Sequence, residues 1–224
     1  DLKDPIGQGI SQQIRNQQQD QIPRLFHFAQ LLLVLAKNEA KYATVGTPVK
    51  FWSAWKETFA KAETAKLQEL VNIPLTEAQL DRLMAARPWS VREKALSYGN
   101  IERQVTEQDR TLYALCRPPR LLELIRRFML YDAGEKKIAR YQQYFCVTKI
   151  INRIQRTRED GTRQGGVVWH TQGIGKSLTM VMPAEAIVHA TDTDIDNYRI
   201  MLETDRGDLD DQIYKTFYHR GTLP

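Results

Sequence analysis

The stretch GGVVWHTQGIGKSLTM, residues 165–180, constrains the fold of this chain more than any other feature. A β-branched run leads into a glycine-rich turn, and Gly-Lys-Ser then opens an apolar segment. A strand, a glycine-rich turn and a helix, in that order, form the context in which such a loop binds nucleotide phosphates. We therefore predict a strand over residues 166–171 and a helix from about Gly175. The alternative is a chance Gly-x-Gly-Lys-Ser sequence in an ordinary loop.

Each residue of the predicted loop has a part in phosphate chemistry. Gly173 and Gly175 would permit the close approach and the unusual φ angles that such a loop needs. Backbone N–H groups from Gln172 to Lys176 would surround a phosphate, with the positive end of the following helix behind them. The Lys176 ammonium would hold the β- and γ-phosphates, and the Ser177 hydroxyl would coordinate Mg²⁺.

Three residues depart from the usual pattern of a phosphate loop. His170 stands where the first glycine of GxxxxGK[ST] is expected, and Ile174 places a β-branched side chain between two glycines. Pro183 falls within the predicted helix, where a proline costs about 3 kcal/mol and kinks the backbone. The sequence therefore predicts either a short or bent helix after the loop or a degraded copy of the motif.

Composition narrows the class of protein. The 224 residues, 42% of them apolar and 26% charged, suit a globular protein of one large or two modest domains. Cys116 and Cys146 form no CxxC pair, which argues against a zinc site or a disulfide framework. No apolar run reaches the ~18 residues needed to span a bilayer. We expect a cytoplasmic chain with no membrane span, and, because it starts at Asp1 without a methionine, a fragment.

A net charge of +5 permits nucleic-acid binding but does not establish it, because a solvated basic surface gives the same total. The remaining pattern alternates helices with short strands, which predicts an α/β fold. The predicted elements are a helix at 10–22 (or a polar linker), a strand at 28–36, a short strand or turn at 41–48, an aromatic helix at 51–59 that packs in the core or stacks on bases, a helix start at 74–80 with a Thr76–Gln79 capping box, amphipathic helices at 117–132 and 136–158, a polar loop at 158–166, a strand at 198–205 and a helix at 209–221.

Several segments together resemble the motor subunit of type I restriction-modification enzymes. VVWHTQGIGKSLTM resembles that family's motif I, and its Trp-His-Thr-Gln-Gly lead-in implies nucleotide binding by Thr171 and Gln172. ARYQQYF resembles the segment upstream of motif I in which an Arg and a Gln contact the adenine. The resemblance therefore implies adenine contacts for Arg140 and Gln143.

The resemblance extends to both ends of the chain. LETDRGDLDDQI resembles the motif Ia segment, which implies that Asp205 and Arg206 face DNA. DLKDP resembles part of the family's PD-(D/E)xK nuclease, with Asp1 as a metal-binding carboxylate and Lys3 as the catalytic lysine. On a strand these two side chains would project to one face and share a metal-bound water. Gln13 matches the Gln-x-x-x-Tyr element of that nuclease as a further catalytic residue, although Gln17 replaces its tyrosine.

The resemblance implies three segments: the end of a nuclease-like domain at 1–60, a helical connector at 61–120, and the beginning of a RecA-like lobe of a superfamily 2 helicase at 121–224. It implies ATP and Mg²⁺ as cofactors, and double-stranded DNA with methyltransferase and specificity subunits as partners. The implied activity is ATP-dependent DNA translocation with metal-dependent cleavage. Two alternatives stay open: an inactive remnant that binds nucleotide or DNA, and another superfamily 2 DNA helicase.

Overall fold

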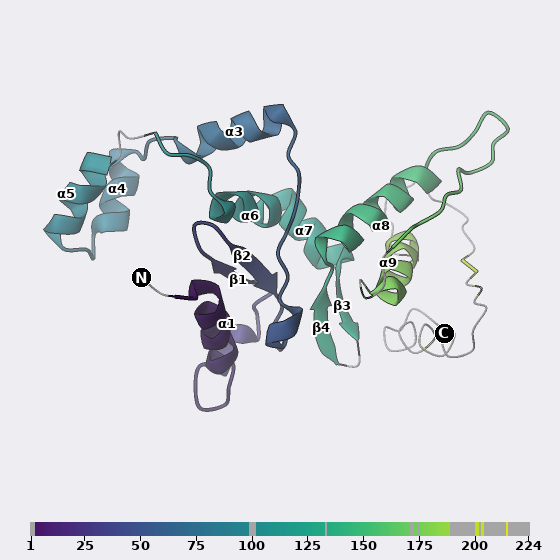
Figure 1. The fold of residues 1–224 in the computed structure, drawn as a ribbon, viewed down its shortest axis with the longest axis horizontal. Coiled ribbons are helices and arrows are strands. Elements are labelled where there is room, and N and C mark those ends of the chain that lie inside the picture. Colours follow the sequence, from purple (N-terminus) through teal and green to yellow (C-terminus); the bar gives the residue numbers. More distant parts are fainter. Residues whose placement is uncertain are drawn as a thin grey trace.

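A computed structural model of the chain describes residues 3–98, 102–132, 134–170, 173, 175–188, 200, 201, 203 and 214. Along this part of the chain, groups of helices are separated by two pairs of short strands (Figure 1). The helices are α1 (Pro5–Asn16), α2 (Pro23–Phe26), α3 (Lys61–Val71), α4 (Glu77–Met84), α5 (Trp89–Tyr98), α6 (Glu107–Cys116), α7 (Pro118–Arg127), α8 (Tyr141–Ile154) and α9 (Lys176–Val188). The other elements are β1 (Leu32–Leu35), β2 (Ala40–Ala43), β3 (Met129–Asp132), β4 (Glu135–Ile138) and the 3-10 turn η1 (Val49–Phe51).

The described strands form two antiparallel hairpins. In the first, Leu32 of β1 lies opposite Ala43 of β2, and α1 packs beside β1. In the second, Met129 of β3 lies opposite Ile138 of β4, and the turn uses Gly134 at φ +82°. This mixture of helices and small sheets agrees with the predicted α/β class.

One hydrophobic core joins distant parts of the chain. Its buried members, which come from all three predicted segments, are Tyr42, Trp55, Ala114, Leu115, Leu124, Phe128, Leu130, Ala139, Tyr144, Val147 and Met182. A smaller core lies under α1 and contains Ile6, Ile10, Phe26, Leu32, Val34, Ala43 and Trp52. The packing therefore runs across the boundaries proposed at residues 60 and 120, and the three-segment division stays a prediction.

A buried ion pair connects α7 to the chain that precedes α3. Both guanidinium nitrogens of Arg120 contact Glu57, at 3.0 and 3.2 Å, and the two side chains are only 14% and 11% exposed. Arg120 also lies 4.5 Å from the ring centre of Tyr144 on α8. Trp55 Nε1 donates to the same Glu57 carboxylate at 2.8 Å. The charge of Arg120 is thus matched inside an aromatic cluster that joins three segments.

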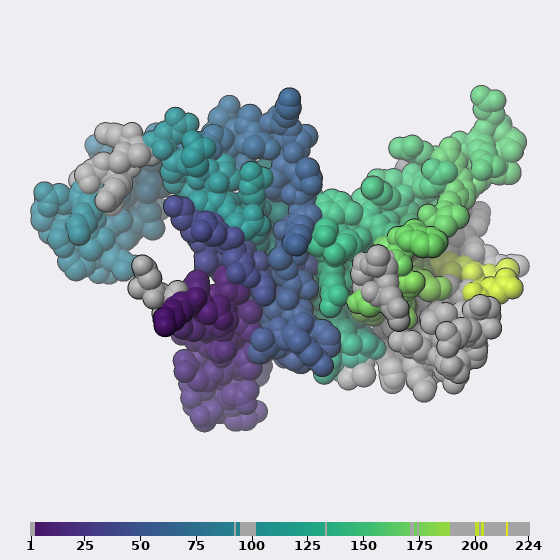
Figure 2. All heavy atoms as spheres, viewed as in Figure 1, coloured from purple at the N-terminus to yellow at the C-terminus, as the bar shows by residue number. Residues whose placement is uncertain are grey.

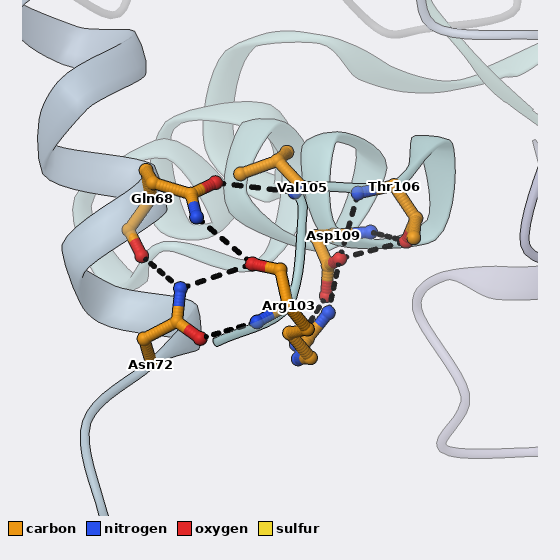
Figure 3. A network of polar contacts seen from close by, with 6 residues as sticks. All are labelled: Gln68, Asn72, Arg103, Val105, Thr106 and Asp109. Atoms are coloured by element: carbon orange, nitrogen blue, oxygen red, sulfur yellow. Dashed lines mark hydrogen bonds and ion pairs between the residues drawn. The ribbon is translucent and has the colours of Figure 1, made fainter. Parts of the chain in front are cut away.

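A second polar network fixes α3 to the start of α6 (Figure 3). Asn72 Nδ2 donates to the Arg103 carbonyl at 3.0 Å, and the Arg103 N–H donates to Asn72 Oδ1 at 2.9 Å. The Arg103 guanidinium then forms two contacts with Asp109, at 2.7 and 2.9 Å. Asp109 also accepts from the N–H of Thr106, the residue that caps α6. Side-chain amides thereby hold the chain that enters α6.

Several sequence predictions about these elements are confirmed. Residues 28–36 contain β1, and residues 158–166 form a loop. Thr76 and Gln79 make the predicted capping box at α4. The predicted helix at 10–22 is confirmed only over 10–16: α1 begins earlier, because Asp4 accepts from the Gly7 N–H at 2.8 Å and caps it, and it ends at Asn16.

Other predictions about the elements were wrong. Residues 51–59 do not form a helix, because the chain there is extended and Ser53 pairs with Tyr42. Trp52 and Trp55 are buried as predicted, but in different cores. Residues 129–138, assigned to two long helices, form the hairpin of β3 and β4 instead. The segments 198–205 and 209–221 lie almost entirely outside the described residues.

The predicted strand at 166–171 is also absent over its described residues, 166–170. Val167 and Trp169 are 93% and 90% exposed. A strand needs a neighbour for its backbone hydrogen bonds. No described strand lies beside this segment, which explains its extended but unpaired backbone.

Candidate nucleotide-binding site

The glycine-rich turn before α9 has the geometry that the sequence predicts. Gly173 and Gly175 both have φ of +84°, a region that favours glycine. α9 begins at Lys176, and its first hydrogen bond runs from the Thr179 N–H to the Gly175 carbonyl at 3.1 Å. The amide groups of the first turn have no acceptor within the helix, which makes this end suited to an anion.

Pro183 does not shorten α9, which continues to Val188. The Pro183 side chain is buried, together with the neighbouring Met182 and Ala184. Of the alternatives predicted from Pro183, a short helix is therefore wrong. Burial against the rest of the structure offsets the missing hydrogen bond of the proline.

Gln143 connects α8 to the phosphate loop. It is 3% exposed, and its Oε1 accepts from the Arg140 N–H at 2.8 Å. Its Nε2 donates to the Gly175 carbonyl at 3.1 Å. A Cβ built on Gly175 would lie 2.9 Å from the same Nε2, so only glycine fits at this position without movement. The two ends of the Gln143 amide thus fix the loop against the first turn of α8.

Arg140 lies beside Gln143 at the entrance to α8. Its Nη1 makes a long contact of 3.5 Å with the Gly173 carbonyl. The preceding carbonyl, that of Ala139, accepts from the buried Tyr42 hydroxyl at 2.9 Å. Burial raises the pKa of Tyr42, which keeps this hydroxyl a neutral donor. β2 and the phosphate loop therefore contact the same short stretch of chain.

A pocket of about 740 Å³ opens where the loop glycines Gly173 and Gly175 meet Arg140 and Gln143 at the start of α8, here called the nucleotide joint. It is lined by four predicted site residues: Arg140, Gln143, Gly173 and Gly175. The opposite walls carry aromatic and basic side chains, among them Phe26, Tyr42, Phe51, Tyr131, Lys136 and Lys137. An aromatic and basic lining suits a ligand with a flat ring and negative charge.

Sequence reasoning missed these walls, because they come from loops and hairpins far from the motif. Lys136 is an example: its ammonium donates to Gln30, 106 positions away, and burial lowers its pKa. No local pattern signals such a contact. Only the basic pair Lys136–Lys137 just before Arg140 could have drawn attention to β4.

Lys176 does not lie in this pocket. Its exposed side chain lines a second hollow of about 430 Å³, together with Trp169, His170 and Met180. Ser177 is half-buried at the second position of α9. The structure thus brings Arg140, Gln143 and the two glycines together around one pocket, whereas Lys176 lines another. Thr171 and Gln172 lie outside the described residues.

The structure describes two of the predicted nuclease residues, Lys3 and Gln13. Lys3 is exposed in a bend before α1 rather than in a strand. Gln13 is half-buried on α1, and its carbonyl accepts from Gln17 Nε2 at 3.0 Å. Gln17 in turn accepts from the Gly46 N–H at 2.8 Å, which gives this departure from the family pattern a structural role.

Three further predicted site residues, Asp1, Asp205 and Arg206, lie outside the described residues. Within the described part, no group of three or more His, Cys, Asp or Glu side chains could hold a metal ion. The predicted metal contact of Asp1 and the predicted DNA contacts of Asp205 and Arg206 remain predictions.

Comparison with known proteins first identifies a class. Residues 142–223 match the SWI2/SNF2 ATPase family. That range starts at α8 and includes the phosphate loop, so the helicase-like ATPase part agrees with the geometry above. No solved structure matches this chain significantly.

Curated relatives narrow the class of protein further. The chain is 40% identical over 112 residues to the type I restriction enzyme HindI endonuclease subunit of Haemophilus influenzae, a match that covers 47% of this chain and 10% of that protein. It is 30% identical over 208 residues to the MjaIXP endonuclease subunit of Methanocaldococcus jannaschii, whose name assigns it to the type I restriction enzymes. That match covers 88% of this chain and 17% of the relative.

These relatives confirm the predicted resemblance to endonuclease subunits of type I restriction enzymes. The chain spans less than a fifth of the length of either relative. None of the helices in the described residues is long and apolar enough to cross a membrane.

Proposed function

We propose that this chain is part of the restriction subunit of a type I restriction-modification system and that it binds ATP. The whole subunit would use ATP to translocate double-stranded DNA and would cleave it with a metal-dependent nuclease. It would work with methyltransferase and specificity subunits in the cytoplasm. The single observation that carries the nucleotide part is the joint between Gln143 and the two positive-φ glycines, Gly173 and Gly175.

The residues at the joint fit a nucleotide. The first-turn amide groups of α9 and the exposed Lys176 would hold the phosphates, and the Ser177 hydroxyl would reach Mg²⁺. Arg140 and Gln143 would lie toward the base, because they line the aromatic pocket. Bound Mg²⁺ would neutralise phosphate charge. Such binding requires the long Lys176 side chain to turn from the second hollow toward the loop.

The test is binding of a fluorescent ATP analogue in the presence of Mg²⁺, measured by titration. Lys176→Ala should lose saturable binding, because it removes the cation that faces the phosphates. Lys66→Ala is the matched control, since it removes an exposed lysine from α3 far from the loop. Equal binding by wild type and Lys176→Ala, in chains with the same circular dichroism, would contradict the proposal.

The same titration, combined with assays of ATP hydrolysis and of DNA cleavage, separates the alternatives. An inactive remnant with a spoiled loop would bind no nucleotide although folded. A remnant that retains the loop would bind the analogue without hydrolysing ATP. Another superfamily 2 helicase would share the ATP site but lack the nuclease, which DNA cleavage by the whole subunit would distinguish.

A further inference from the structure

The loop between α8 and the phosphate loop forms a small ordered hairpin, residues 155–164, here called the arginine arm. The Arg158 N–H donates to the Thr162 carbonyl at 2.7 Å, and the Gln164 N–H donates to the Arg156 carbonyl at 3.1 Å. Gly161 occupies the turn at φ +78°. The arm projects from the end of α8 into solvent, as Figures 1 and 2 show.

The arm and the last turns of α8 carry many exposed cations. Their five basic residues, all exposed, are Lys149, Arg153, Arg156, Arg158 and Arg163. Two acidic residues, Glu159 and Asp160, lie at the tip. Asp160 is already engaged, because its carboxylate accepts from the Thr162 N–H and hydroxyl at 2.9 and 2.6 Å. Those bonds lower its pKa and keep it charged.

These cations differ from the paired arginines elsewhere in the chain. Arg103, Arg117 and Arg120 each contact a carboxylate within 3.0 Å. Over the residues that the structure describes, no ion pair involves the five cations of the arm and of the end of α8. Arg153 and Arg163 donate only to the carbonyls of Gly165 and Ile154, which leaves their charge uncompensated.

The pairing within the arm also sets the direction of its arginines. Arg156 lies opposite Gln164 and Arg158 opposite Thr162, with the Thr157–Arg163 bridge between them. Alternate residues of a strand project to the same face. Arg156 and Arg158 therefore form one cationic face, and among the described residues neither side chain has a hydrogen-bond or ion-pair partner.

We propose that the arginine arm contacts the phosphate backbone of duplex DNA. The proposal rests on the proposed function, which makes duplex DNA the polyanion that the whole subunit handles. An exposed, projecting hairpin suits a long backbone rather than a small anion, which needs an enclosed site. Residues 149–164 contain no aromatic side chain, so the arm lacks the stacking surfaces that single strands prefer.

The position of the arm gives such a contact a consequence. The arm is the covalent link between α8, which begins beside Arg140 and Gln143, and the segment that leads to Gly173. A DNA backbone held here would lie one short segment of chain away from the nucleotide joint. The contact would be insensitive to sequence, because arginines on phosphates do not read bases.

The test measures binding of a labelled duplex by fluorescence anisotropy over a range of salt concentrations, with the 224-residue chain. Arg156→Ala/Arg158→Ala should weaken binding about tenfold or more and reduce the salt slope by about 2, roughly one for each phosphate contact. Arg82→Ala/Arg87→Ala is the matched control, because it removes two exposed arginines at α4. Arg156→Lys/Arg158→Lys should retain most of the salt slope.

Each outcome decides the proposal. Equal losses in the arm variant and the α4 control would overturn it, since net charge alone would then explain binding. An unchanged arm variant, or a wild-type chain that binds no duplex, would also overturn it. Titration of the same proteins with the fluorescent ATP analogue shows separately whether the nucleotide proposal holds.

Discussion

The region around α1 and the region around α8 and α9 were both expected to carry site residues, and they differ sharply. In the second region, Gln143 is 3% exposed and both ends of its amide contact backbone groups of the site. In the first, Gln13 is only half-buried, and its backbone carbonyl, not its side chain, makes the contact with Gln17. The two glutamines therefore differ in burial and in side-chain contacts, although the same resemblance implied a functional role for both.

This difference teaches how a motif depends on its surroundings. The phosphate loop and the following helix are local, so the sequence carries nearly everything that shapes them. A metal-dependent nuclease needs carboxylates from separate strands to converge. Lys3 lies in a bend, and the described residues around it supply no such cluster. A local match is thus a stronger guide to the nucleotide loop than to the nuclease.

The largest expected effect comes from breaking the buried ion pair of Glu57 and Arg120, which lies between the two regions in the sequence. Glu57→Ala leaves the Arg120 guanidinium buried without its carboxylate, which should cost about 3–5 kcal/mol in the free energy of unfolding. Urea denaturation followed by circular dichroism measures this. Glu57→Ala/Arg120→Met should recover most of the loss, because the uncompensated charge is then gone. A cost below about 1 kcal/mol for Glu57→Ala would mean that the regions do not depend on this pair.

The two glutamines supply the next prediction. Gln143→Ala should lower the free energy of unfolding by about 1–3 kcal/mol, because it removes the acceptor of the Arg140 N–H and the side-chain donor that ties the Gly175 carbonyl to α8. It should also weaken binding of the ATP analogue. Gln13→Ala should change stability by less than about 0.5 kcal/mol. Similar losses for both variants would remove the contrast between the regions.

The local features of the fold could be predicted from the sequence. The Thr76–Gln79 capping box and the start of α9 both follow from residues close together in the chain. It failed where a distant partner decides the conformation. Residues 51–59 have helical spacing of aromatics, but backbone pairing of Ser53 with Tyr42 holds them extended. Periodicity describes which side chains are buried and does not say what buries them.

The candidate site likewise has parts that could be predicted from the sequence and parts that could not. Gly173, Gly175 and the first turn of α9 were predictable, because positive φ and a helix start leave local traces. The pocket wall that Phe51 supplies was not, since it depends on how the loop after β2 folds over the joint. The same holds for the position of Lys176, which lines the opposite hollow.

A smaller effect is expected from two glycines that share a φ angle but not their surroundings. Gly175→Ala should cost about 1–2 kcal/mol in backbone strain and should also displace Gln143, whose Nε2 would lie 2.9 Å from the new Cβ. Gly161→Ala has φ +78° and open space and lies outside the pocket, so it should show the strain alone. Thermal denaturation and nucleotide titration separate the two variants. Loss of nucleotide affinity in Gly161→Ala as well would show that strain, not contact with Gln143, matters.

The smallest effect tests the helix caps that lie between the two regions. The Arg103 guanidinium and the Thr106 donors hold the pKa of the Asp109 carboxyl well below its usual range. A lowered pKa stabilises the fold above the ordinary value near 4, and this stabilisation is lost as the pH falls further. Asp109→Asn should therefore cost about 1 kcal/mol at pH 7, and the cost should shrink below about pH 4.

The second capping box supplies the control for that pH dependence. Thr76 and Gln79 do not titrate, so the cost of Thr76→Ala, also about 1 kcal/mol, should be the same at pH 7 and pH 3. Urea denaturation at both values measures the two differences. If the cost of Asp109→Asn also stays constant with pH, the carboxylate charge contributes nothing beyond the cap. The contact with Arg103, which is half-exposed, would then be a surface ion pair of little consequence.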